Sequence, residues 1–182
     1  MISNFVVVPN AISDEDMNRL EILCSTKTLS SGLVDGGKEK GVRKSKILFL
    51  EPEDGLWVFN IIGSIAESAN EVFKFDISRV DMLQYGEYDS EYGGHYGWHS
   101  DSQIGSKEKQ LDRKLSISLQ LSDTDEYEGG NLELRLASPV KKEIRERGTA
   151  IVFPSFLEHR VTKVTKGKRS SLVAWIEGEK FC

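Results

Sequence analysis

Three side chains able to bind a metal ion stand out in the second half of the chain. His99 and Asp101 are separated by one residue in His99-Ser100-Asp101, and His159 follows 58 residues after Asp101. At the end of a strand, residues two apart point to the same side, so His99 and Asp101 can reach a common point. Two imidazoles and one carboxylate form the ligand set of non-haem Fe(II) oxygenases, which leaves open positions on the ion.

The same residues have a simpler interpretation. His-x-Asp is a weak pattern, and His99 and His159 can be ordinary, partly buried histidines, with Asp101 in a turn. The chain has only three histidines, and the metal hypothesis uses two of them. The choice between the interpretations therefore depends on a third element of the sequence.

That element is Arg169, ten residues after His159 in Lys166-Gly167-Lys168-Arg169-Ser170-Ser171. A dicarboxylate that binds iron through a 2-oxo acid end has a far carboxylate that must be neutralised, and arginine offers a planar, bidentate partner. Ser171 lies two residues further on, so it shares a strand face with Arg169 and can add a hydroxyl donor. Together these residues favour an iron site with a 2-oxo acid co-substrate.

The elements that must position these residues are two helices and a series of strands. Phe5 to Val8 is extended, and Ser13 with an acid three residues on predicts a helix through about Leu23. Apolar residues at three- and four-residue steps predict a second helix from about Leu56 to Val72. From Ile77 onward the apolar period is two, and short strands without intervening helices favour an antiparallel sandwich or barrel.

The composition is that of one soluble, slightly acidic domain. The chain has 182 residues, 38% of them hydrophobic and 29% charged, with a net charge of -5. The acidic balance argues against a nucleic-acid partner, and no apolar run reaches the roughly 18 to 20 residues that span a membrane. We expect a cytoplasmic protein without membrane contact. Cys24 and Cys182 indicate neither a disulfide framework nor a zinc-thiolate site, and Cys182 is expected to be an exposed free thiol.

A set of motifs, in order along the chain, resembles the prolyl 4-hydroxylase-like branch of the Fe(II)/2-oxoglutarate oxygenases. The resemblance covers roughly Ile77 to Glu177, and its pieces are specific together although each is weak alone. They are Tyr85-Gly86, Tyr96-Gly97-Trp98-His99-Ser100-Asp101, Arg113-Lys114-Leu115-Ser116, Leu121-Ser122, Glu128-Gly129-Gly130-Asn131-Leu132, Phe153-Pro154-Ser155, His159-Arg160-Val161 and Gly167-Lys168-Arg169 through Trp175.

The resemblance implies a mainly β fold, a double-stranded β-helix or jelly roll flanked by helices. We expect a single domain over residues 1–182, with 1–76 as a helical and strand support region and 77–178 as the catalytic core. It also implies Fe(II) and 2-oxoglutarate as cofactors, with ascorbate as an optional third. His99, Asp101 and His159 then act as metal ligands, and dioxygen, 2-oxoglutarate and a substrate yield succinate, CO2 and a hydroxylated product.

The resemblance implies further residues for the co-substrate site. Tyr85 matches a tyrosine near the 2-oxoglutarate, and Trp175 matches an aromatic side chain lining the barrel, although core packing is the simpler role for either. Gln120 departs from the family, because several prolyl hydroxylases have a tyrosine there that bonds the far carboxylate. Either the amide of Gln120 replaces it, or Arg169 and Ser171 hold that carboxylate alone.

The substrate stays open at this stage. The branch implies a prolyl residue of a protein or peptide; a free amino acid or other small metabolite is the alternative, and a non-catalytic jelly-roll binding module is a further one. His95 has either a structural role or a place at the substrate entrance. Two hydrophilic segments, Asp35 to Lys46 and Ser102 to Arg113, are either solvated loops or lids over the site.

Overall fold

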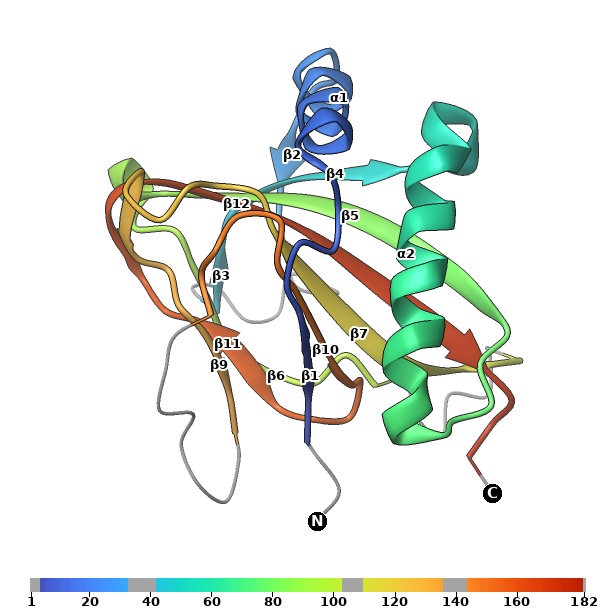
Figure 1. Cartoon of the computed structure of the whole chain (residues 1–182). Coiled ribbons are helices and arrows are strands. Elements are labelled where there is room, and N and C mark those ends of the chain that lie inside the picture. Colours follow the sequence, from blue (N-terminus) through green and yellow to red (C-terminus); the bar gives the residue numbers. More distant parts are fainter. Residues whose placement is uncertain (1–3, 33–41, 103–109, 136–143, 182) are drawn as a thin grey trace.

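The computed structural model describes residues 4–32, 42–102, 110–135 and 144–181, and it has two β-sheets with two helices packed on one of them (Figure 1). Every strand pair given for these residues is antiparallel. The larger sheet has the order β1 (Val6–Val8), β10 (Ala150–Pro154), β7 (Asp112–Gln120), β12 (Val164–Gly178), β5 (Arg79–Asp89), β4 (Lys46–Leu50) and β2 (Ser30–Ser31), with β8 (Tyr127–Gly129) paired to the beginning of β12.

The smaller sheet has four short strands in the order β3 (Arg43–Lys44), β6 (His95–His99), β11 (His159–Val161) and β9 (Leu132–Leu134). A single turn of 3-10 helix, Ser90–Tyr92, connects β5 to β6, so the chain passes directly from the larger sheet to the smaller one. The expectation of a mainly β, jelly-roll-like fold with flanking helices is confirmed.

Helix α1 (Asp14–Ser25) begins where the sequence predicted. The hydroxyl of Ser13 accepts a hydrogen bond of 3.1 Å from the backbone N–H of Asp16, which is the expected N-cap. Helix α2 (Pro52–Phe73) begins four residues before the predicted Leu56. Gly55 has non-helical backbone angles, so a short first turn is separated from the regular helix, and the apolar periodicity detected only the regular part.

Both helices cover the outer face of the larger sheet, where the main core lies. Leu20 of α1 and Ile62 of α2 are fully buried against strand residues of the same face, such as Leu83, Ile117 and Leu172. Burial of such apolar side chains is the main force that holds the helices to the sheet. The inner face of the larger sheet is thereby left to face the smaller sheet.

The N-terminal 76 residues take part in the larger sheet as well as supporting it. Strand β1 pairs with β10, with Val6 opposite Val152, and β4 pairs with β5, with Leu48 opposite Tyr85. These pairings join residues far apart in the sequence, so a division at residue 76 does not separate two sheets. Within the described ranges, neither helix is long and apolar enough to cross a membrane.

Candidate active site

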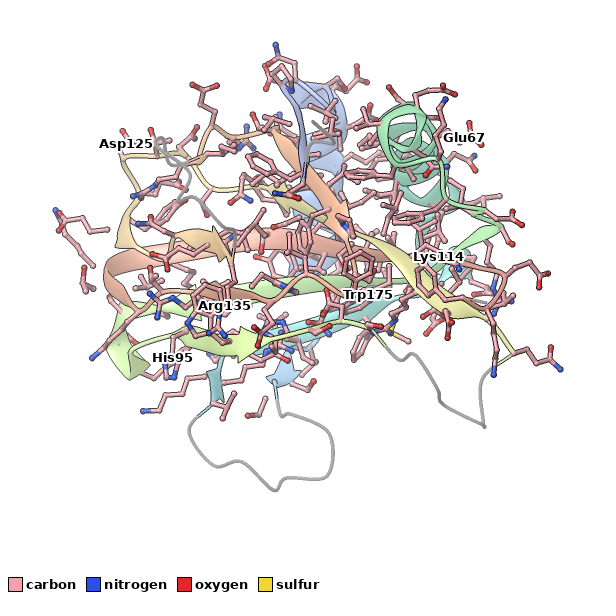
Figure 2. All side chains as sticks on the ribbon, turned by 90° about the horizontal axis from the view of Figure 1, so that it is seen from below. Glu67, His95, Lys114, Asp125, Arg135 and Trp175 are labelled. Carbon is pink, nitrogen blue, oxygen red and sulfur yellow. The ribbon has the colours of Figure 1, made fainter. Side chains whose placement is uncertain are left out.

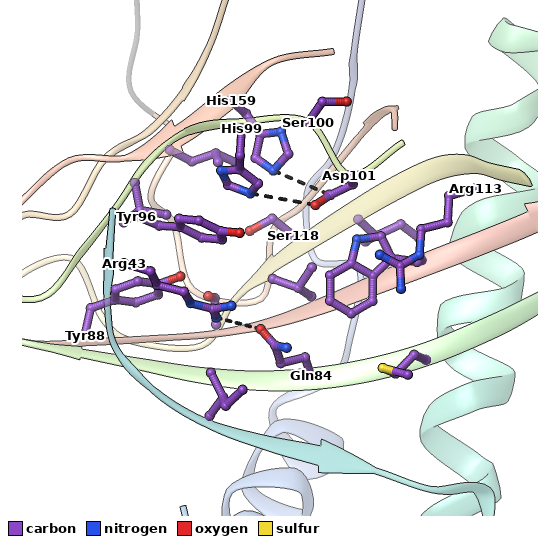
Figure 3. A pocket seen from close by; sticks show the side chains of 18 of the residues that line it. Arg43, Gln84, Tyr88, Tyr96, His99, Ser100, Asp101, Arg113, Ser118 and His159 are labelled. Carbon is purple, nitrogen blue, oxygen red and sulfur yellow. Dashed lines mark hydrogen bonds and ion pairs between the residues drawn. The ribbon is translucent and has the colours of Figure 1, made fainter. Parts of the chain in front are cut away.

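His99, Asp101 and His159 converge at one end of the smaller sheet (Figure 3). His99 ends β6 and His159 begins β11, and the two residues are direct cross-strand partners with ring centroids 4.1 Å apart. Asp101 follows β6; its Oδ1 lies 3.7 Å from Nε2 of His99 and its Oδ2 lies 3.4 Å from Nε2 of His159. One ligand atom from each of the three residues lies within 4.8 Å of the others.

Backbone hydrogen bonds orient both imidazoles. Nδ1 of His99 donates to the carbonyl of Gly97 at 2.8 Å, and Nδ1 of His159 donates to the carbonyl of Leu157 at 3.0 Å. A proton held on Nδ1 leaves the lone pair on Nε2, and both Nε2 atoms lie on the side of Asp101. Burial and the nearby His159 also lower the pKa of His99 to about 4. Its imidazole is therefore neutral near pH 7, as metal binding requires.

The three groups fit a divalent metal ion. Two imidazole nitrogens and one carboxylate, buried or nearly so, converge on one point and leave one side open to a cavity. This nitrogen and oxygen set suits Fe(II), and purified protein can also take nickel, cobalt or zinc by the general order of affinities. His95 is not part of this cluster, and its Nδ1 donates to the carbonyl of Gly93. Figure 2 shows His95 at the end of β6 that is farther from Trp175.

A cavity of about 740 Å³ lies between the two sheets, beside the triad formed by His99, Asp101 and His159. Its walls come from β2, β4, β5, β7, β10 and β12 of the larger sheet and from β3, β6, β9 and β11 of the smaller one. Arg43 and Arg113 lie on its wall. The guanidinium of Arg43 is stacked over the ring of Tyr96, and this ring is stacked on that of His99, with the ring centroids 3.5 Å apart. The cavity is large enough for a small dicarboxylate together with part of a second molecule.

Arg169 lies on the wall of this cavity and is 1% exposed. Its Nη1 donates to the hydroxyl of Ser171 at 3.1 Å and its Nη2 donates to the side-chain oxygen of Gln120 at 2.9 Å, whereas its Nε is buried and has no partner in the part of the chain that the structure describes. Both acceptors are neutral, and no carboxylate of the described residues pairs with this guanidinium. Burial lowers the pKa of Arg169, so a bound anion would relieve an unfavourable environment.

The structure brings most of the predicted co-substrate residues together. Ser171 lines the cavity beside Arg169, and Gln120 is buried behind the guanidinium. Trp175 also lines the cavity, and Arg113 stacks on its ring; Figure 2 shows it near the middle of the molecule. Its indole N–H has no hydrogen-bond partner among the described residues.

Tyr85 is not brought to the cavity. Its hydroxyl donates a hydrogen bond of 3.0 Å to the hydroxyl of Ser170, and its ring packs against the helix-covered core. Side chains alternate along β5, so Gln84 and Tyr88 face the cavity while Tyr85 faces away. Tyr88 is the tyrosine that the sequence interpretation missed: it is the cross-strand partner of Arg169, with its ring 5.5 Å from the guanidinium carbon.

Gly129 ends β8 and Gly130 follows it, and Gly130 lies against the arginine of the site. Gly129 and Gly130 have φ of +73° and +63°, which favours glycine. A Cβ on Gly130 would lie 3.0 Å from Cδ of Arg169 and 2.9 Å from a methyl of Val164. Gly130 therefore leaves room for the arginine because it lacks a side chain. Of the two hydrophilic segments, interpreted as either solvated loops or lids, residues 35–41 and 103–109 lie outside the described residues.

A jelly-roll-like β-structure with this triad beside a buried arginine is the structural class of Fe(II)/2-oxoglutarate oxygenases. The model of the 2OG-Fe(II) oxygenase superfamily matches residues 83–177, and the chain belongs to this family. It is an oxygenase whose cofactors are Fe(II) and 2-oxoglutarate.

Individual relatives agree with this assignment. The chain is 30% identical to a PKHD-type hydroxylase of Thermosynechococcus vestitus, over 93% of this chain and 76% of that protein. Several other curated relatives are matched over less than half of their own length. Two solved structures share the fold: a Pseudomonas putida prolyl-4-hydroxylase (TM-score 0.76, 18% identity, 97% of this chain and 93% of that one) and a Trichoplax adhaerens prolyl hydroxylase in complex with a hypoxia inducible factor peptide fragment (TM-score 0.71, 16% identity, 95% and 83%).

Proposed function

We propose that this protein hydroxylates an unactivated C–H bond at the site formed by His99, Asp101 and His159, with Arg169 binding the far carboxylate of 2-oxoglutarate. The observation that carries the proposal is the environment of Arg169. A fully buried guanidinium with only neutral acceptors, on the wall of the cavity that the triad borders, is the partner that a dicarboxylate needs. Gln120 orients the guanidinium from behind and Ser171 from the side.

Each group of the site has a defined task in this proposal. Bound Fe(II) supplies the redox and dioxygen chemistry that side chains cannot perform. The two histidines present their Nε2 atoms to the ion, and Asp101 supplies the carboxylate of the ligand set. Phe153 packs edge-on against His159 at 4.8 Å between ring centroids, which keeps water from that side of the imidazole. No side chain needs to act as a general base.

For the substrate, we propose a prolyl residue of a protein or peptide. The support is the likeness to structures named as prolyl hydroxylases, one of them bound to a peptide. The cavity, with a volume of about 740 Å³, has room for a prolyl side chain of a peptide beside the co-substrate. Dioxygen is the second partner that this chemistry requires.

A free amino acid or other small carboxylate is the second candidate, and Arg43 favours it. Its guanidinium donates to Gln84 at 2.6 Å and to the hydroxyl of Ser45 at 2.7 Å, so both acceptors are neutral. It has no carboxylate partner among the residues that the structure describes. An arginine held in this way on the cavity wall can bind the carboxylate of a small substrate, or a backbone carbonyl of a peptide.

The test is a substrate screen with two readouts. Protein loaded with Fe(II) without oxygen is mixed with 2-oxoglutarate and then with oxygen, in the presence of proline-containing peptides or of free amino acids. Succinate release and the gain of one oxygen atom by the substrate are followed together. Coupled product from peptides supports the prolyl proposal; coupled product only from free amino acids overturns it in favour of the second candidate, and succinate from no mixture overturns the enzyme proposal itself.

A further inference from the structure

The carboxylate of Asp101 is held by a chain of two buried hydroxyl groups, which the sequence motif of the metal ligands does not include. Oδ2 of Asp101 accepts a hydrogen bond of 2.7 Å from Oγ of Ser116, and a second bond of 3.0 Å joins the hydroxyls of Ser116 and Ser155. Ser116 and Ser155 are both 0% exposed. A hydroxyl bond of this length to a carboxylate is typical of a charge-assisted interaction.

The direction of the chain follows from the number of protons available. A carboxylate only accepts, so the single proton of the Ser116 hydroxyl must point to Asp101. The bond between Ser116 and Ser155 must then be donated by Ser155. Each donor in such a chain polarises the next, which strengthens the final bond to the carboxylate.

The backbone around Asp101 is fixed by the same neighbour. The N–H of Asp101 donates to the carbonyl of Ser155 at 3.0 Å, and the hydroxyl of Ser100 donates to that carbonyl at 3.1 Å. The N–H of Ser155 in turn donates to the carbonyl of Lys114 on β7 at 3.0 Å. The segment that leaves β6 is therefore tied to the end of β10, and rotation of the Asp101 side chain remains as the principal freedom.

We infer that Ser116 is a positioning residue for the metal site, which occupies Oδ2 of Asp101 and leaves Oδ1 free to bind the ion as a single oxygen. The inference rests on the proposed function, because it requires that Asp101 is a metal ligand. Without the hydroxyl of Ser116, Oδ2 loses its 2.7 Å hydrogen-bond donor, and the carboxylate can turn or offer both oxygens to the ion. Either change removes a position that the co-substrate or dioxygen needs.

The experiment measures Co(II) binding to protein freed of metal, by titration calorimetry and by the visible spectrum of the bound ion. Removal of a group that supports a metal ligand typically weakens metal binding by about 10- to 100-fold, and we expect a loss in that range for Ser116→Ala. Ser116→Thr retains the hydroxyl and should restore most of the affinity. Ser155→Ala removes only the donor to Ser116, so its loss should be smaller.

The matched control is Ser122→Ala, which removes another buried hydroxyl with backbone hydrogen bonds, away from the triad. It should bind Co(II) as the wild-type protein does. The unfolding temperature of the metal-free variants separates a fold defect from a metal-site defect: an effect of Ser116→Ala that is confined to unfolding, with wild-type Co(II) affinity and spectrum, overturns the inference. Wild-type protein that binds no Co(II) overturns the proposed metal site instead, so the two failures are distinguishable.

Discussion

Gln120 accepts a hydrogen bond of 2.9 Å from Nη2 of Arg169, and both side chains are almost completely buried. The amide thus occupies the position where a tyrosine was expected from the family, but it bonds the arginine rather than facing the cavity. The guanidinium is held from behind by Gln120 and from the side by Ser171, with its charge left for a ligand. This relationship makes the contribution of Arg169 measurable.

Arg169→Ala should raise the apparent KM for 2-oxoglutarate by at least about tenfold. Breaking a buried charge pair costs on the order of 3 to 5 kcal/mol, whereas loss of one hydroxyl donor costs on the order of 1 to 3 kcal/mol. Ser171→Ala should therefore have a weaker effect, and Arg169→Lys should restore only part of the loss because lysine lacks the planar pair of donors. Steady-state succinate formation at varied 2-oxoglutarate checks this, and an unchanged KM in Arg169→Ala would remove the arginine from the site.

Gly130→Ala should raise the same KM. The added Cβ would press on Cδ of Arg169 at 3.0 Å, and the left-handed backbone costs a residue other than glycine roughly 1 to 2 kcal/mol. Gly148→Ala is the control, because its φ is also positive, at +79°, but its Cβ would meet the flexible side chain of Met17 and not the arginine. Both variants should lose stability in urea unfolding, but only the first should change the KM. Equal KM values would show that Arg169 adjusts without loss.

Tyr85→Phe should leave the KM for 2-oxoglutarate unchanged. Its hydroxyl bonds only Ser170 on the helix-covered face, so the variant should lose about 0.5 to 1.5 kcal/mol of unfolding free energy, the typical value of one hydrogen bond. Tyr88→Leu removes the ring beside Arg169 and should raise the KM. The two variants are compared in one assay. A raised KM in Tyr85→Phe alone would favour the role that the family resemblance implies.

The sequence interpretation placed Tyr85 near the co-substrate, whereas the structure puts Tyr88 on the cavity wall. This difference shows how much the sequence can predict. That His99, Asp101 and His159 cluster and border one cavity with Arg169 was predictable, because few residue types bind iron or a buried carboxylate and the chain has only three histidines. Tyr85 was placed by motif likeness, although strand alternation from Met82 and Gln84 already put it on the other face. The hydroxyl of Ser116 reaches Asp101 only through the pairing of β7 with β10, a long-range register that local patterns do not encode.

The helix-covered core gives a prediction that is independent of the metal. Burial raises the pKa of Cys24 from 9.0 to about 12, so between these values the unfolded chain loses a proton that the folded chain keeps. Stability should therefore fall as the pH rises through this window, by at most about 1.4 kcal/mol per pH unit. Urea unfolding from about pH 8 to about pH 10.5 should show a steeper fall in wild type than in Cys24→Ala. Parallel curves would mean that the thiol ionises in the folded protein.

The most direct test of the whole account is oxygen-dependent succinate formation by protein loaded with Fe(II). The measurement compares the wild type with His99→Ala, Asp101→Ala, His159→Ala and the control His95→Ala, each checked for a folded β-rich domain by circular dichroism. We expect succinate from the wild type and from His95→Ala at similar rates, and none from the three triad variants, because each lacks a ligand of the open metal site. Near-normal succinate formation by a folded His159→Ala protein would contradict the ligand assignment on which the account rests.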